Sequence, residues 1–222
     1  MRLFFILILA LTGIQLIPQT IRAQKNPLVL ICPHGDAKSS KMDQKKCCPL
    51  SQVHAFAQKL GALLQKKYNF RVALTHELTD TLATWRITSL TNKVEANLFL
   101  NLHLYHQTSN KPHISIFYLT YNSLTEQKNR IFPPCSFIPV RLAHLMCLQT
   151  TRHYAHLIHK TLEQPKYQKQ LSIDAPLGIP LISLAGISIP ALTIEVGIND
   201  QNQWEQLIKP LIKSLNFQIN NN

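Results

Sequence analysis

Residues 98–104 have the sequence Leu-Phe-Leu-Asn-Leu-His-Leu, and this short run of mostly apolar side chains decides the class of fold. Its length and composition predict a buried β-strand. Residues 26–32 and 191–196 carry similar runs, and residues 50–67 place apolar side chains at the spacing of one helix face. Strands that alternate with helices predict an α/β fold, with a largely parallel, twisted sheet that has helices on both faces.

Further elements are expected along the chain. We predict strands at residues 71–74, 114–121 and 179–184, and helices at residues 80–95, 139–163 and 204–215. Asp80 is the expected N-cap of the first of these helices, whereas Pro210 disfavours the middle of the last one. The chain has 222 residues and no repeat of fixed period, which indicates one domain rather than a repeat array.

The composition excludes several classes of protein. Hydrophobic residues make up 45% of the chain and charged residues 15%, which excludes an intrinsically disordered protein. Lys and Arg number 23 against 11 Asp and Glu, so the formal net charge is +12. The basic residues are spread along the chain and form no stripe with aromatic residues. We therefore expect attraction to an anionic polymer and no nucleic-acid site.

Residues 1–23 have the layout of a secretory signal peptide. A short basic start precedes a nearly unbroken apolar run at residues 3–17, and Ala23 supplies a small residue for cleavage. The run is short for a membrane-spanning helix, which needs about 20 apolar residues. We therefore expect residues 24–222 to form an exported domain, periplasmic or extracellular, with no stable membrane span once the leader is removed. An uncleaved leader would tether it to the membrane.

Polar residues of the kind that bind or serve a metal follow three of the expected strands. His34 lies just after the first strand, His103 at the end of the third and Glu195 near the end of the last. In sheets of this class the functional residues lie at the carboxyl ends of the strands, which makes these three the candidate site. Two imidazoles are typical zinc ligands, and a glutamate that is not a ligand can act as a base toward water.

The order of these motifs resembles the zinc-dependent N-acetylmuramoyl-L-alanine amidases that cut peptidoglycan. Residues 31–35 (ICPHG) are similar to the family's Pro-Gly-His-Gly turn, one glycine shorter. Residues 96–103 (ANLFLNLH) resemble the strand that leads into its second metal histidine. Residues 189–199 (IPALTIEVGIN) resemble its closing strand, which carries the catalytic glutamate, and the resemblance covers roughly residues 27–215.

The resemblance implies a function and a set of site residues. The implied reaction is hydrolysis of the amide between N-acetylmuramic acid and L-alanine, with peptidoglycan as the partner and zinc as the cofactor. His34 and His103 fall on the metal histidines, and Glu195 falls on the catalytic base. Arg86 falls on the arginine of a helix between the two histidine motifs, which makes it a candidate substrate-binding residue.

One metal-ligand position of this chain departs from the family pattern. In the family, the third metal ligand is a glutamate at the start of the first helix. Counting back from residues 57–64 places Pro49 at that position in this chain. Proline binds no metal, so the neighbouring Cys48 is the expected third ligand, because a thiolate binds zinc well. Asp43 is the alternative. If neither is a ligand, the chain is a catalytically impaired protein of the amidase fold that binds cell-wall glycan or a partner.

The sequence also allows other assignments. An N-formylglutamate amidohydrolase also has a Pro-His turn after its first strand, but the expected export and the motif around Glu195 argue against that enzyme. The five cysteines are odd in number, so at least one is a thiol or a metal ligand, and their pairing is undetermined. The oligomeric state is undetermined as well.

Overall fold

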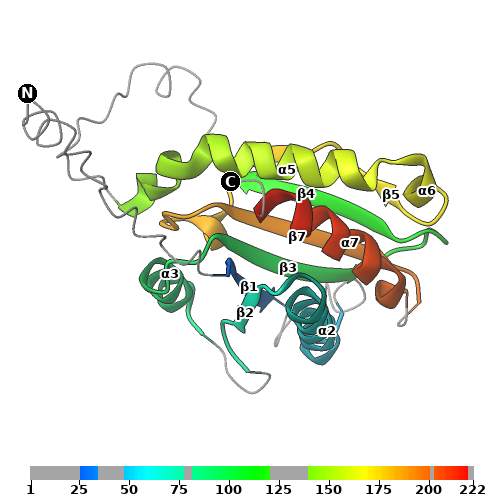
Figure 1. Ribbon diagram of the computed structural model, residues 1–222, viewed down its shortest axis with the longest axis horizontal. Helices are drawn as coiled ribbons and strands as arrows, with labels where there is room; N and C mark the ends of the chain where they lie inside the picture. The colour runs from blue at the N-terminus through cyan, green and yellow to red at the C-terminus, as the bar shows by residue number, and fades with distance from the viewer. Residues whose placement is uncertain (1–25, 35–47, 78–81, 121–139, 201–202, 220–222) are drawn as a thin grey trace, which may run out of the picture.

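The computed structural model describes residues 26–34, 48–77, 82–120, 140–200 and 203–219, which are built around one seven-stranded sheet (Figure 1). The strands are β1 Leu28–His34, β2 Arg71–Leu74, β3 Leu98–His106, β4 His113–Leu119, β5 Ser172–Ile173, β6 Leu177–Ile179 and β7 Ala191–Ile198. The helices are α2 Leu50–Tyr68, α3 Thr84–Lys93, α5 Leu148–Leu162, α6 Pro165–Gln168 and α7 Trp204–Ile219, with 3₁₀ turns η1 Val140–Cys147 and η2 Ile182–Leu184.

The sheet has the order β2-β1-β3-β7-β4-β5, and β6 also pairs with β4, further along that strand than β5 does. All pairs are parallel except β4 with β7, which are antiparallel. The central strands are buried on both faces, which explains their nearly continuous apolar sequences. The prediction of a largely parallel α/β sheet is confirmed.

Two apolar clusters cover the two faces of the sheet. Leu100, Leu102 and Leu104 of β3 belong to the larger cluster, together with buried residues of α2, α5 and α7. Figure 1 shows α7 lying across the sheet between α5 and α2. We call this side the helical face. Phe99, the alternate residue of β3, belongs to the smaller cluster with Ile87 of α3. We call this side the α3 face.

Helix α2 is fixed against the edge strand β2 by a close approach at Gly61. A Cβ atom at this position would lie 2.9 Å from Cγ1 of Val72, so any larger residue would push the helix away from the strand. The helix ends at Asn69, which has a left-handed backbone (φ 57°) and donates its N–H to the carbonyl of Gln65. The short link from α2 to β2 therefore holds the two elements at a fixed distance.

Several boundaries differ from the predictions. The helix expected at residues 139–163 begins as the 3₁₀ turn η1 and becomes α-helical at Leu148, because Cys147 has φ −121° and ψ 10°. The strand expected at residues 179–184 is wrong. Strand β6 ends at Ile179, because the following proline has no N–H to donate, and η2 takes its place.

The remaining predictions concern α3, α7, the leader and two short elements. Helix α3 begins at Thr84, with Ala83 as its N-cap. Asp80, the expected N-cap, lies outside the described residues, as does the leader expected at residues 1–23. Helix α7 continues through Pro210. The short elements β5 and α6 were not predicted, because two and four residues carry too little periodicity. None of the described helices is long and apolar enough to cross a membrane.

Candidate active site

Three adjacent parallel strands bring His34, His103 and Glu195 into one row at the carboxyl edge of the sheet. His34 of β1 is the register partner of His103 of β3, and His103 is the partner of Glu195 of β7. Alternate residues of a strand lie on the same face, and each of the three is an even number of residues from a member of the smaller cluster on its own strand. Their side chains therefore leave the sheet on the α3 face. We call these residues the strand-end row.

The strand-end row is compact and reachable from solvent. The ring centroids of His34 and His103 are 6.0 Å apart, with an angle of 53° between the ring planes. His103 Nδ1 lies 3.8 Å from Oε1 of Glu195, and these side chains are 23% and 36% exposed. Two imidazoles on one tetrahedral zinc ion, with Zn–N bonds of about 2.0–2.1 Å, have centroids about 5 Å apart, so the pair lies within about 1 Å of the spacing for a shared ion.

A buried layer beneath the strand-end row holds the register. Asn101 lies two residues before His103 and is 4% exposed. Its Nδ2 donates to Thr193 Oγ1 at 3.3 Å and to Ser183 Oγ at 3.5 Å. A slip of one residue between β3 and β7 would break these bonds and send His103 and Glu195 to opposite faces.

Strand β4 extends the polar surface on the far side of Glu195. Ser115 is the antiparallel register partner of Glu195. The Ser115 hydroxyl donates to Oδ2 of Asp174 at 3.0 Å, and His113 Nε2 lies 2.8 Å from the same oxygen. A hydrogen-bonded histidine, serine and aspartate therefore flank the strand-end row.

Tyr105 lies across Gly197, next to this cluster. A Cβ atom on Gly197 would lie 2.7 Å from Cζ and 2.8 Å from the hydroxyl of Tyr105, so the glycine makes room for the ring. Burial, followed by the negative charges of Glu195 and Asp174, raises the pKa of Tyr105 above its ordinary value. The phenol therefore stays protonated near neutral pH and is a hydrogen-bond donor beside Glu195.

The comparisons with known proteins agree with this geometry. Residues 29–213 match the model of the family described as N-acetylmuramoyl-L-alanine amidase, which is most of the chain. The chain belongs to the N-acetylmuramoyl-L-alanine amidase family. No curated protein sequence matches the chain at a significant level. Members of this family hydrolyse the amide that joins N-acetylmuramic acid to L-alanine, so the chain is a hydrolase of a linear amide bond that acts on the cell wall.

Solved amidase structures share the fold. The catalytic domain of the amidase CwlV from Bacillus (Paenibacillus) polymyxa var. colistinus superimposes with a TM-score of 0.61 at 14% identity, covering 87% of this chain and 98% of that domain. The CwlD amidase from Clostridioides difficile, solved in complex with the GerS lipoprotein, gives a TM-score of 0.59 at 14% identity, covering 89% and 100% of the two chains. This similarity shows that the chain has the fold of an amidase catalytic domain.

The amidase fold does not bring Cys48 to the strand-end row. Cys48 is 1% exposed and belongs to the apolar cluster of the helical face, whereas His103 leaves the sheet on the α3 face. Among the described residues, no three His, Cys, Asp or Glu side chains form a group that could hold a metal ion. The alternative ligand Asp43 lies outside the described residues. Pro49 is the N-cap of α2, with no side-chain hydrogen bond.

Arg86, the candidate substrate-binding residue, and the buried thiol of Cys32 lie on the same side of the sheet as the strand-end row. Arg86 is exposed on α3, and its guanidinium carbon lies 5.2 Å from the ring centroid of Trp85. Cys32 is 2% exposed beneath the strand-end row, and burial raises the pKa of its thiol to about 11. This thiol therefore stays protonated at neutral pH and is a poor metal ligand and nucleophile.

The sequence analysis missed Tyr105, Ser115 and Asp174 as parts of the site. Tyr105 is two residues after His103, so the strand period of two was a signal for it. No such signal exists for Ser115, because its place beside Glu195 depends on the antiparallel pairing of β4 with β7. Asp174 follows a strand of two residues, too short to predict.

Proposed function

We propose that this chain hydrolyses the amide between N-acetylmuramic acid and L-alanine in peptidoglycan, with zinc bound by His34 and His103 and with Glu195 as the general base. The observation that supports these roles most strongly is the shared register of the three residues across β1, β3 and β7. The family membership supplies the reaction, and the strand-end row supplies the chemical groups for it.

Bound zinc would supply a Lewis acid that polarises the substrate carbonyl and lowers the pKa of water. The chain's own residues perform the remaining steps. Glu195 takes a proton from the attacking water and returns it to the nitrogen of L-alanine as the amide bond breaks. Oε1 of Glu195 lies 3.8 Å from Nδ1 of His103, which supports a role for this carboxylate beside the proposed metal-binding histidines.

Tyr105 has a supporting role in this proposal. Its protonated hydroxyl lies on the same face as Glu195 and donates a hydrogen bond to an oxygen of the substrate. Gly197 keeps the ring in place, since a side chain there would collide with it. Arg86, exposed on α3, is proposed to contact the glycan or peptide further from the scissile bond.

The cellular setting follows from the substrate. Residues 1–23 are proposed to direct export, after which residues 24–222 act as the catalytic domain in the periplasm or outside the cell. Without Arg2 and Arg22 of the leader, 21 basic and 11 acidic residues leave a formal charge of about +10, which favours approach to anionic polymers of the cell wall.

The decisive experiment is digestion of purified peptidoglycan with the chain and added zinc, analysed by mass spectrometry. Stem peptides that begin with L-alanine, absent when Glu195→Gln replaces the wild type, are the expected products. If no cleavage occurs over a range of zinc concentration and pH, the chain is a binding protein on an amidase scaffold. Pro49→Glu is then the first variant to test for a gain of activity.

A further inference from the structure

The positive charge of the chain lies almost entirely on one side of the sheet. The helices α2, α5, α6 and α7, with Glu163 and Lys169 directly after α5 and α6, carry nine Lys and Arg and only two Glu. These helices pack on the helical face, α6 through Tyr167. The rest of the described chain carries five Lys and Arg against five Asp and Glu. The helical face therefore holds the whole positive excess of the described residues.

Exposed lysines supply eight of these nine basic residues. They are Lys59, Lys66, Lys67, Lys160, Lys166, Lys169, Lys209 and Lys213. Among the described residues only Lys59 has a carboxylate partner, Glu205 Oε1 at 2.8 Å. The ninth, Arg152, is half-buried, with its guanidinium carbon 5.6 Å from the ring centroid of Tyr118. Seven exposed ammonium groups are therefore available to an anionic partner.

A hollow between α2 and α7 gives this basic surface a shape that suits a chain-like partner. It has a volume of about 630 Å³ and is lined by Lys59 of α2, Lys209 of α7 and Gln170 beyond α6, among others. Lys66 lies two turns after Lys59, about 10 Å further along the same side of α2. Lys213 lies one turn after Lys209, about 6 Å further along α7. Positive charge therefore continues along both sides of the hollow.

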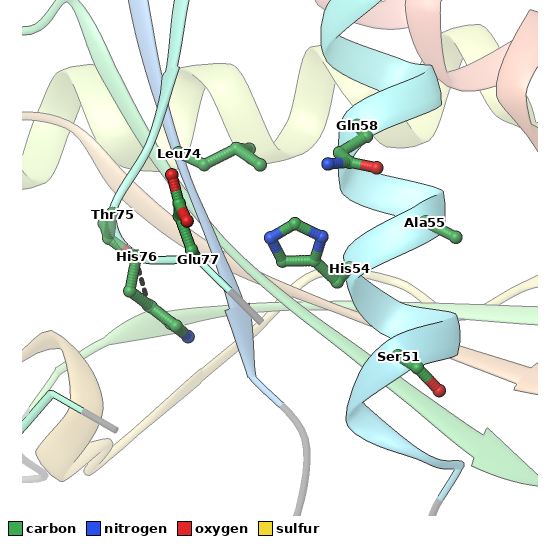
Figure 2. A pocket seen from close by; sticks show the side chains of 8 residues that line it. All are labelled: Ser51, His54, Ala55, Gln58, Leu74, Thr75, His76 and Glu77. Carbon is green, nitrogen blue, oxygen red and sulfur yellow. Dashed lines mark hydrogen bonds between the residues drawn. The ribbon is translucent and has the colours of Figure 1, made fainter. Parts of the chain in front are cut away.

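The basic surface ends on the β2 side of α2. A polar cavity separates the helix there from the chain that follows β2, and none of the eight described residues that line it is Lys or Arg. Figure 2 shows the Glu77 carboxylate across this cavity from His54 of α2. A carboxylate repels an anion, so an anionic polymer is expected on the α7 side of α2.

The side chains of the basic surface favour phosphate groups on a flexible polymer. Lysine binds phosphate as a point charge without a fixed geometry, and the surface has no exposed arginine. The exposed large apolar side chains of the described chain all lie outside α2, α5, α6 and α7; they are Trp85, Val140, Met146, Leu177 and Ile182. The surface thus lacks the apolar side chains that insert into a bilayer and the aromatic rings that stack on nucleic-acid bases.

We propose that the helical face binds a phosphodiester polymer of the cell wall, which lies along the hollow between α2 and α7. The sheet separates this surface from the strand-end row, so a bound chain keeps its candidate active site accessible to peptidoglycan. The location in the cell wall rests on the proposed function, whereas the binding itself depends only on the lysines.

The first test is calorimetric titration of the protein with a poly(glycerol phosphate) chain of defined length, at several salt concentrations. Lys209→Gln/Lys213→Gln is expected to weaken binding at least about fivefold at low salt. The slope of log affinity against log salt should fall by about 1.4–1.8, since each phosphate contact contributes about 0.7–0.9. Lys93→Gln/Lys111→Gln removes two exposed lysines elsewhere and is the matched control, expected to change affinity less than about twofold.

Three outcomes of the titration would overturn the inference. Equal losses in the two double variants would mean that net charge alone attracts the polymer, without a defined surface. Tighter binding to phosphatidylglycerol vesicles would make a bilayer the partner. Tighter binding to a single-stranded oligonucleotide would make nucleic acid the partner.

Hydrolysis separates this inference from the proposed function. Lys209→Gln/Lys213→Gln is expected to keep the wild-type kcat/KM for a soluble N-acetylmuramoyl peptide and to release stem peptides more slowly from whole cell walls. The difference on walls should disappear once hydrofluoric acid has removed their phosphate polymers, and its persistence would contradict the proposed partner. If the wild type hydrolyses nothing but binds poly(glycerol phosphate) through these lysines, the amidase proposal alone fails.

Discussion

His103 and Glu195 lie directly opposite each other in the parallel pairing of β3 and β7, with Nδ1 of the histidine 3.8 Å from Oε1 of the glutamate. The buried bonds of Asn101 beneath them hold this register. The pairing of two adjacent strands therefore holds a candidate metal ligand, His103, next to a candidate general base, Glu195.

Glu195→Gln is expected to lower kcat for peptidoglycan hydrolysis at least about 100-fold, since general-base catalysis contributes on this scale. The amide keeps the size of the side chain but accepts no proton. The release of stem peptides measures the effect, and circular dichroism checks the fold. A variant that keeps more than a tenth of the activity would show that another group is the base.

His34→Ala and His103→Ala are each expected to weaken zinc binding at least about 100-fold, because a catalytic zinc ion depends on every one of its few protein ligands. Calorimetry and the metal content of the dialysed protein measure the loss. His159→Ala on α5, where the imidazole lies 3.7 Å from Glu163, is the matched control and should bind zinc like the wild type. Equal binding by all three variants would place the metal elsewhere.

Cys48→Ala is expected to lower the free energy of unfolding by about 1–2 kcal/mol and to leave zinc affinity unchanged. The reason is that Cys48 packs in the apolar cluster of the helical face, opposite to the strand-end row. Urea denaturation and zinc titration measure the two quantities. A loss of zinc binding without a loss of stability would restore Cys48 as the third ligand.

Gly197→Ala is expected to lower kcat more than it changes KM, because the new Cβ would lie 2.7 Å from the ring of Tyr105 and displace it. Tyr105→Phe removes the hydroxyl alone and should lower kcat at least about tenfold. If Tyr105→Phe keeps full activity while Gly197→Ala does not, the effect of the alanine is steric and the phenol donates nothing to the substrate.

Alkaline conditions are expected to destabilise the fold through Cys32. Burial raises the pKa of this thiol from 9.0 to about 11, so the unfolded chain ionises first as the pH rises. The contribution of the protonated thiol to the free energy of unfolding is fully present below about pH 8. It is lost between about pH 9 and pH 11, by about 2–3 kcal/mol in total. Denaturation at several pH values should show a shallower fall for Cys32→Ala, and an identical slope in both proteins would contradict the raised pKa.

The sequence by itself determined most of the strands and helices, and it showed that the candidate catalytic residues lie at the carboxyl ends of strands. Apolar runs such as residues 98–104 specify a strand through local spacing, and a histidine at the end of such a run must lie at the edge of the sheet. The order of motifs also pointed to the family that residues 29–213 match. Local spacing fixes element boundaries only loosely, so α3 begins at Thr84 rather than at residue 80, and the helix expected from residue 139 begins as the 3₁₀ turn η1.

Only the tertiary structure decided which side chains meet. Cys48 is adjacent in sequence to the family's ligand position, yet it packs in the apolar cluster of the helical face, whereas His103 leaves the sheet on the α3 face. The antiparallel pairing of β4 brings Ser115 beside Glu195, and the packing of α2 beside β2 places His54 and Glu77 in the lining of one cavity. Strand order, register and helix packing are long-range properties, and no local pattern of residues contains them.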